Sequence, residues 1–297
     1  MISLINPSLF LDILIGGLIL GAIYSVIAAG LNLQYGVTRM LNVAHGDFLM
    51  LGAYLTYFSV TLLNMNPFAS IIIVGPSMIS IGLLVYALIF RRVVTLSRTA
   101  GELEFRSLLL FFGLSFVIQN LAMILWTANY RGYEAPTLGS VNVLGVTFEV
   151  NRIIIALISI LINVFLYLFL RYTKVGLAMR ATVDQPEGAQ IVGINIYTIF
   201  AISFGIGVLL GGWSGILISI LYSAINPFMG VPYTLIALVL VVLAGVGSFK
   251  GNIVGGFILG YLAYFTMRVI HSALTLVVIY AILILILLVR PRGLFVR

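Results

Sequence analysis

The sequence predicts an all-α protein, a polytopic transmembrane helix bundle with eight or nine membrane segments. Hydrophobic residues make up 62% of the 297 residues and charged residues only 8%, whereas charged residues are about 25% of an ordinary soluble domain. The apolar runs are continuous, which excludes the alternating strands of a membrane β-barrel. A chain surrounded by lipid satisfies its backbone hydrogen bonds within helices.

Nine apolar segments are candidates for membrane crossing, since a crossing helix needs about 20 apolar residues. Two of them, between residues 233 and 267, are short and separated only by "FKGN", and the second segment is also marginal. Eight crossings are therefore as consistent with the sequence as nine. The segments are Leu9–Gly30, Gly46–Leu63, Ala69–Phe90, Ser107–Trp126, Ile153–Leu170, Ile199–Tyr222, Tyr233–Ser248, Ile253–Met267 and Ser272–Val289.

The basic residues predict the orientation of the bundle. If residues 91–106, 171–180 and 290–297 are cytoplasmic, nine segments place twelve of the fifteen basic residues inside. This asymmetry agrees with the positive-inside rule. We therefore expect the N-terminus outside and the C-terminus in the cytoplasm. The three basic residues left outside are Arg131, Arg152 and Arg268.

Two cytoplasmic stretches contain signals for short helices. In Arg91–Arg106, Thr99 and Glu102 have capping-box spacing, so we expect a helix to restart there. In the longer stretch, residues 171–195, "DQPE" from Asp184 to Glu187 has the same spacing, with a proline that suits a first helical turn. We predict two short helices across the cytoplasmic face in this second stretch. Their modest apolar side would be formed by Leu177, Ala181 and Val192.

The stretch "NVAHGD", Asn42–Asp47, places polar and helix-breaking residues between two apolar runs. Asparagine caps helices, glycine bends them, and aspartate favours a helix N-terminus. One interpretation is an interrupted helix that lines a passage, and the other is a capped loop at the cytoplasmic surface. We expect Asn120 to be buried within its span and paired with a neighbouring helix. The candidate lining residues are Asn42, His45, Gly46, Asp47, Asn120 and Asn226.

Glycines at four-residue intervals occur twice in the second half of the chain. This spacing lets helices approach closely, so we expect these glycines at helix contacts. Together they indicate helices that slide or rock. They are Gly207, Gly211, Gly215, Gly247, Gly251 and Gly255.

Several function classes are disfavoured by the sequence. It has no cysteine and only two distant histidines, His45 and His271, so we expect no metal site. The stretch "GVGSFKGN" lacks the order of a phosphate-binding loop. The spans lack the mid-membrane acids of a proton-coupled carrier and the clustered titratable groups of an enzyme. We attribute the +7 net charge to cytoplasmic loops and expect no nucleic-acid partner.

The chain resembles the branched-chain amino-acid permease family of bacterial and archaeal ABC importers, and most closely its LivH-type subunit. The resemblance lies first in "GLNLQYGVTRMLNVAHGDFLMLGAYLTY" and covers nearly the whole chain in the family's order. It continues through "GLAMRATVDQPEGAQIVGIN", "GGWSGIL", "LAGVGSFKGNIVGGFILGY" and "LVRPRGLF". The stretch Arg91–Arg106 is longer and more charged than we expect of the family.

The resemblance implies that residues 1–297 form a single permease domain without enzyme activity or a cofactor of its own. Its expected partners are a second, LivM-like permease, two P-loop ATPase subunits that hold ATP and Mg²⁺, an external binding protein and membrane lipid. The substrate would be leucine, isoleucine or valine, and the location the inner membrane. The alternatives are urea, short amides or other small amino acids, and a stand-alone secondary carrier. The loop that docks on the ATPases would include Arg180, Asp184, Glu187 and Gly193.

Overall fold

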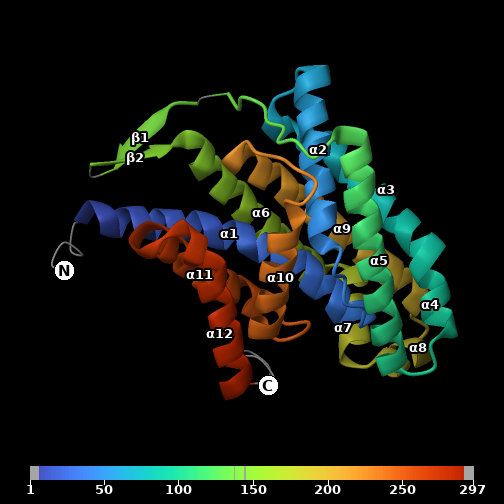
Figure 1. The fold of residues 1–297 in the computed structure, drawn as a ribbon. Helices are drawn as coiled ribbons and strands as arrows, with labels where there is room; N and C mark the ends of the chain where they lie inside the picture. The colour runs from blue at the N-terminus through green and yellow to red at the C-terminus, as the bar shows by residue number, and fades with distance from the viewer. Residues whose placement is uncertain (1–6, 137, 144, 291–297) are drawn as a thin grey trace.

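The computed structural model describes residues 7–136, 138–143 and 145–290, and their fold is a bundle of α-helices with one short β-hairpin (Figure 1). In the hairpin, Ser140 pairs with Glu149 and Val143 with Val146 in antiparallel register. The elements are α1 (Pro7–Thr38), α2 (His45–Leu63), η2 (Pro67–Ser70), α3 (Ile71–Val85), η3 (Tyr86–Phe90), α4 (Arg91–Leu96), α5 (Ala100–Trp126), β1 (Ser140–Val143), β2 (Val146–Glu149), α6 (Val150–Tyr172), α7 (Lys174–Asp184), α8 (Pro186–Ile191), α9 (Ile196–Tyr222), α10 (Gly230–Ala244), α11 (Phe249–Phe265), η4 (Thr266–Ile270), η5 (Ser272–Leu274) and α12 (Thr275–Val289).

Eight helical segments of the described chain are long and apolar enough to cross a membrane, which confirms the predicted fold class. Consecutive helical elements join into single segments in three regions, Pro67–Leu96, Phe249–Ile270 and Ser272–Val289. The ninth candidate, α10, is apolar but has only 15 residues, fewer than the about 20 that a straight crossing needs. How α10 is placed therefore decides how the chain crosses the membrane.

The loops gather on two opposite ends of the bundle. At one end, which we call the hairpin face, Arg268 near the end of η4 forms an ion pair with Asp12 of α1. On the same face, Arg131 and Ile225 exchange backbone hydrogen bonds of 2.8 and 2.7 Å. At the other end, which we call the α7 face, the C-terminal part of α1 meets α7 and the loop between α10 and α11.

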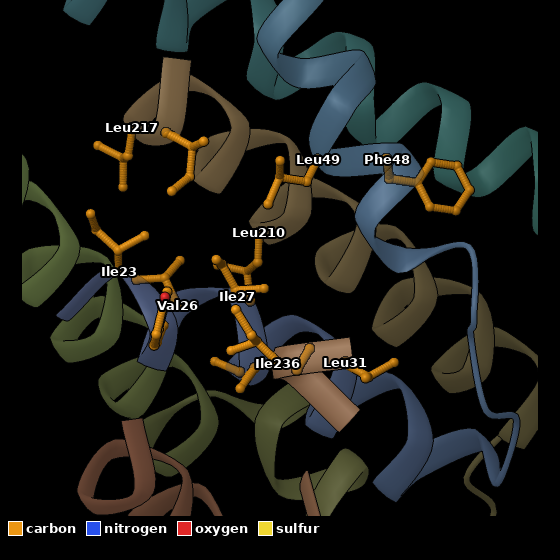
Figure 2. Close-up of a cluster of buried hydrophobic side chains, with 14 of the residues drawn as sticks. Ile23, Val26, Ile27, Leu31, Phe48, Leu49, Leu210, Leu217 and Ile236 are labelled. Atoms are coloured by element: carbon orange, nitrogen blue, oxygen red, sulfur yellow. The ribbon is translucent and has the colours of Figure 1, made fainter. Parts of the chain in front are cut away.

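Helices α1 and α9 form the centre of the bundle, whereas α5 and α12 lie at its periphery (Figure 1). The most apolar windows of α1 and α9 are 78% buried, but those of α5 and α12 are only 17% buried. Figure 2 shows the core, in which Ile27 of α1, Leu49 of α2 and Leu210 of α9 lie close together. The outer helices carry apolar side chains on both sides because lipid covers one of them.

Glycines allow the central helices to touch at the backbone. A Cβ atom on Gly260 of α11 would lie 2.2 Å from the nitrogen of Gly21 in α1. Likewise, a Cβ atom on Gly215 of α9 would lie 2.0 Å from the carbonyl oxygen of Leu49 in α2. Neither backbone can retreat without moving its helix, so both contacts depend on the missing side chain.

The expected short helices are present as α7 and α8, and Pro186 occupies the first turn of α8. The predicted cap is wrong in detail: Asp184 is the last residue of α7, and Gln185 precedes α8 without a side-chain cap. The chain turns one residue later than the "DQPE" spacing indicates, because α7 continues through Asp184.

The predicted restart at Thr99 is confirmed. Its hydroxyl accepts a hydrogen bond of 3.2 Å from the backbone nitrogen of Glu102 and begins α5. The Glu102 carboxylate accepts a hydrogen bond of 2.8 Å from the nitrogen of Arg98, one residue earlier than a capping box requires.

Candidate functional site

The break between α1 and α2 turns back into the bundle. His45, the first residue of α2, donates from Nε2 to the carbonyl oxygen of Ile27 at 2.9 Å. Ile27 precedes Thr38, the last residue of α1, by eleven residues, or about 16 Å along the helix axis. The six non-helical residues 39–44 can cover that distance when extended. Helix α2 therefore begins inside the protein, and the alternative of a capped surface loop is wrong.

The returning segment is held by buried side-chain amides. Asn42 donates from Nδ2 to Oε1 of Gln34 at 2.9 Å, and both side chains are fully buried. Gln34 in turn donates from Nε2 to the carbonyl oxygen of Phe204 in α9 at 3.0 Å. Because buried amides need partners, this chain of bonds fixes the break between α1 and α9.

The glycines of α9 make room for these polar residues. A Cβ atom on Gly207 would lie 2.2 Å from Cγ of Gln34, and one on Gly211 would lie 3.4 Å from Cε1 of His45. A Cβ atom on Gly30 of α1 would lie 2.8 Å from the same carbon. The imidazole therefore lies between α1 and α9, and a Cβ atom at position 30, unlike one at position 211, would clash with it.

The N-termini of α2 and α10 meet at this level. A Cβ atom on Gly46 would lie 1.9 Å from the carbonyl oxygen of Gly230, the first residue of α10. The nitrogen of Gly46 donates to Oγ1 of Thr234 at 2.8 Å. Both helices thus direct their positive dipole ends into the interior. Helix α10 then continues to the α7 face, while the non-helical residues 223–229 connect it to the hairpin face.

Asp47 lies in the first turn of α2 and is 1% exposed. Its Oδ1 accepts a hydrogen bond of 2.9 Å from Nε2 of Gln119 in α5, and Gln119 also donates to Ser115. Its Oδ2 makes no hydrogen bond to any residue in the described part of the chain. The hydrogen bond from the Gln119 amide and the nearby N-terminus of α2 therefore offset part of the free-energy cost of burying this carboxylate.

Three buried acceptors of the break have no hydrogen-bond partner among the residues that the structure describes. They are Oδ1 of Asn42, Nδ1 of His45 and Oδ2 of Asp47. His45 donates through Nε2, which leaves Nδ1 as an acceptor. The break thus places buried hydrogen-bond acceptors next to two helix N-termini, which carry partial positive charge.

The remaining predicted lining residues lie elsewhere. Asn120 is exposed on α5 and donates to the carbonyl oxygen of Phe116, so its expected burial is wrong. Its neighbour Gln119 enters the interior instead. Asn226 is half-buried in the loop before α10, where its Oδ1 accepts from the nitrogen of Phe228 at 2.8 Å. The structure thus brings together Asn42, His45, Gly46 and Asp47 but not Asn120 or Asn226.

The expected coupling residues lie on or beside α7 and α8. Asp184 and Glu187 are exposed, and Gly193 adopts a positive φ of 86° just after α8. Arg180 donates from its guanidinium to the carbonyl oxygen of Arg171 at 3.3 Å, so it points back toward α6.

The inner side of α7 touches the loop between α10 and α11. A Cβ atom on Gly247 would lie 2.9 Å from Cγ1 of Val183. The nitrogen of Gly247 donates to Oδ1 of Asn32 in α1 at 2.7 Å. Gly247, with φ of 77°, is therefore a loop residue and not the start of a glycine stripe along a helix. Gly251 lies in the first turn of α11, and Gly255 packs against Leu243 of α10.

Gln34, Gln119 and Thr234 are site residues that the sequence interpretation missed. Gln34 and Gln119 are amides within apolar runs, and such residues in a membrane helix mark buried contacts. That signal was present but did not separate Gln119 from Asn120. Thr234 has no comparable signal, since threonine hydroxyls commonly bond to their own helix.

Comparison with known proteins identifies a family. Residues 13–287 match the family model described as "Branched-chain amino acid transport system / permease component". The chain is 30% identical, over 97% of its length and 96% of the relative, to the high-affinity branched-chain amino acid transport system permease protein BraD of Pseudomonas aeruginosa. No solved structure matches the chain.

Two further relatives carry the name LivH. The high-affinity branched-chain amino acid transport system permease protein of Escherichia coli K12 is 28% identical over 97% of this chain and 96% of that protein. The probable branched-chain amino acid transport permease protein of Methanocaldococcus jannaschii is 24% identical over 84% of this chain and 78% of that protein. With its membrane-spanning helices and a family match over most of its length, the chain belongs to the family of branched-chain amino acid transport system permease components.

Proposed function

We propose that this chain is the transmembrane permease subunit of an ATP-driven importer in the cytoplasmic membrane. It would translocate leucine, isoleucine or valine delivered by an external binding protein. A second permease chain would complete the passage, and two separate ATPase subunits would bind ATP and Mg²⁺. The observation that carries the proposal is the family match over residues 13–287, together with a buried polar break that contacts four other helices.

The outer side of α7 and α8 is the proposed ATPase contact. Leu177, Ile191 and Val192 are 59%, 87% and 75% exposed, although they are apolar and lie outside the membrane-spanning helices. The carboxylates of Asp184 and Glu187 are exposed on the same two helices. An exposed apolar patch rimmed by polar groups is typical of a protein interaction site.

A short mechanical path leads from this contact to the buried break. Val183 on the inner side of α7 touches Gly247 in the loop that ends α10. The other end of α10 touches the first turn of α2 at Gly230 and Gly46. Displacement of α7 by the ATPases would therefore move α10 along its axis and change the contact at the break.

The buried break suits a zwitterion that must pass without tight binding. The buried acceptors of Asn42, His45 and Asp47 would offer hydrogen bonds to an ammonium group once a movement of the helices opens the break. The N-termini of α2 and α10 can receive the carboxylate. The apolar core around them, which includes Leu49 and Leu210 (Figure 2), suits a branched side chain.

The coupling assignment is tested with Asp184→Lys/Glu187→Lys in the complete transporter reconstituted in liposomes. We expect leucine uptake to fall while ATP hydrolysis continues, because the reversed charges misplace the ATPase contact without touching the nucleotide site. The charge-conserving control Asp184→Glu/Glu187→Asp should retain uptake. Unchanged uptake in the lysine variant would refute the assignment.

The substrate is tested in the same liposomes with the binding protein present. Labelled leucine should be taken up in an ATP-dependent manner and should be displaced by isoleucine and valine. ATP-dependent uptake of urea or a short amide without leucine uptake would select the alternative substrate class. Uptake by the purified chain alone in an ion gradient would indicate a secondary carrier.

A further inference from the structure

Three cations without a carboxylate partner gather at the α7 face. Arg171 at the end of α6, Arg180 of α7 and Lys250 at the start of α11 line one open cleft of about 650 Å³. The ion pairs within the described residues are Arg106–Glu102, Arg152–Glu149 and Arg268–Asp12, so none of these three cations is paired. Such a cluster attracts an anion.

An apolar groove continues from this cleft along the membrane-spanning surface. It has a volume of about 400 Å³ and lies between α6 and α11, where Ser25 of α1 also lines it. Its walls include Val164, Ile253 and Phe257, and it shares Tyr167, Phe249 and Lys250 with the basic cleft. Phe257 lies seven residues after Lys250, which gives the groove a length of about 10 Å along α11.

The junction of cleft and groove has the features of a membrane interface. The rings of Tyr167 and Phe249 stack across it with centroids 5.9 Å apart. Arg171 lies 5.8 and 5.5 Å from the ring centroids of Tyr167 and Tyr172. Aromatic and basic side chains together are typical of the level where lipid headgroups lie.

We propose that the cleft and groove form a binding site for one anionic phospholipid. The phosphate would lie among Arg171, Arg180 and Lys250, and one acyl chain would lie in the groove between α6 and α11. Basic pockets between membrane helices bind anionic headgroups in this manner. A soluble phosphate compound could bind the three cations, but it has no acyl chain to fill the apolar groove. The inference requires only that the chain lies in a membrane, and it is independent of the transported substrate.

The test is native mass spectrometry of the purified full chain, titrated with phosphatidylglycerol or with phosphatidylcholine of the same acyl chains. We expect one phosphatidylglycerol to bind in preference to phosphatidylcholine. Each removed cation should weaken binding about five-fold, so Arg171→Gln/Lys250→Gln should bind phosphatidylglycerol about 30-fold more weakly. The charge control Arg92→Gln, on α4 and outside this cleft, should bind like the wild type.

The apolar half of the site is tested separately. Val164→Trp should fill the groove and weaken both lipids, whereas Val117→Trp on the exposed surface of α5 should not. Glycerol 3-phosphate serves as the headgroup alone and should bind far more weakly than phosphatidylglycerol. Equal binding of the two lipids, unchanged binding in the double variant, or tight binding of glycerol 3-phosphate would each overturn the proposal. If Arg171→Gln/Lys250→Gln no longer co-purified with the ATPases but still bound phosphatidylglycerol like the wild type, the cations would belong to a protein contact and the proposal would be wrong.

Discussion

Asp47 and Asp12 are both buried carboxylates, but the fold treats them differently. Asp12 pairs with Arg268 at 2.6 Å near the hairpin face. Asp47 accepts a hydrogen bond from the Gln119 amide on one oxygen, and its other oxygen has no partner among the described residues. A buried carboxylate is costly unless its oxygens are hydrogen-bonded. Asp12 thus satisfies a structural requirement, whereas Asp47 keeps an acceptor that a passing ammonium group can use.

Replacing Gln119 with leucine should lower the free energy of unfolding by about 2–3 kcal/mol, because Asp47 loses its donor inside the bundle. The matched control is Asn120→Leu, one residue further along α5, which removes only an exposed bond to the Phe116 carbonyl. We expect that control to stay within about 0.5 kcal/mol of the wild type. Unfolding of the purified chain in detergent measures both. An equal or larger loss from Asn120→Leu would contradict the placement of the two amides.

The sequence interpretation placed Asn120 in the interior, but its neighbour Gln119 is the amide that lies there. This difference shows what the sequence does not predict at the residue scale. Adjacent residues of a helix point about 100° apart, so the amphipathic pattern must decide which one faces inward. Both sides of α5 are apolar, because one side contacts lipid and the other contacts protein. The break itself was predictable from "NVAHGD", but its burial required the contacts of Gln34 and Ile27, which come from tertiary structure.

At the scale of elements, the glycines of α9 have distinct neighbours although their spacing is uniform. Gly215 faces the backbone of Leu49 in α2, while Gly211 faces the His45 side chain at an ordinary contact distance. Gly215→Ala must therefore displace α2, and we expect a loss of about 1–3 kcal/mol or more. Gly211→Ala, one turn earlier in the same helix, should cost much less. Thermal unfolding measures the difference, and equal losses would show that the stripe is uniform.

The contact between α7 and the loop before α11 should transmit movement. Gly247→Ala places a methyl group 2.9 Å from Val183 and strains a positive φ. Gly193→Ala carries the same backbone strain, about 1–2 kcal/mol, with nothing within 4 Å. We expect Gly247→Ala alone to lower the ratio of leucine uptake to ATP hydrolysis in the reconstituted transporter. ATPase co-purification checks that both variants assemble, and equal ratios would remove this contact from the path.

The elements were more predictable than their contacts. The caps at Thr99 and the proline of α8 act through neighbouring residues, so the sequence contains the whole signal. The spacing that includes Gly247 was misleading, because a loop residue with positive φ happens to precede two helical glycines at the same interval. Only the position of the loop between α10 and α11 separates a packing glycine from a turn glycine there.

At the scale of the whole molecule, two broken spans explain why eight and nine segments fitted the sequence equally well. Residues 39–44 and α2 together carry the chain from the α7 face to the hairpin face. Residues 223–229 and α10 carry it back, although α10 alone is too short. We therefore predict nine passages, an odd number, which would place the two ends of the described chain on opposite sides of the membrane. Arg131, Arg152 and Arg268 lie at the hairpin face, which the positive-inside rule predicts to be the outer one.

Single introduced cysteines test this topology, because the chain has none of its own. We expect Asn64→Cys, Glu134→Cys and Ser223→Cys to react with a membrane-impermeant maleimide on intact cells, since all three positions are exposed in loops that end outward-running spans. Gln185→Cys and Val246→Cys should react only after the membrane is opened. The pair at 223 and 246 is decisive, because these residues flank α10. Labelling of both from the same side would mean that residues 223–229 and α10 do not cross the membrane. In that case the N-termini of α2 and α10 would not meet within the membrane, which would contradict the predicted topology.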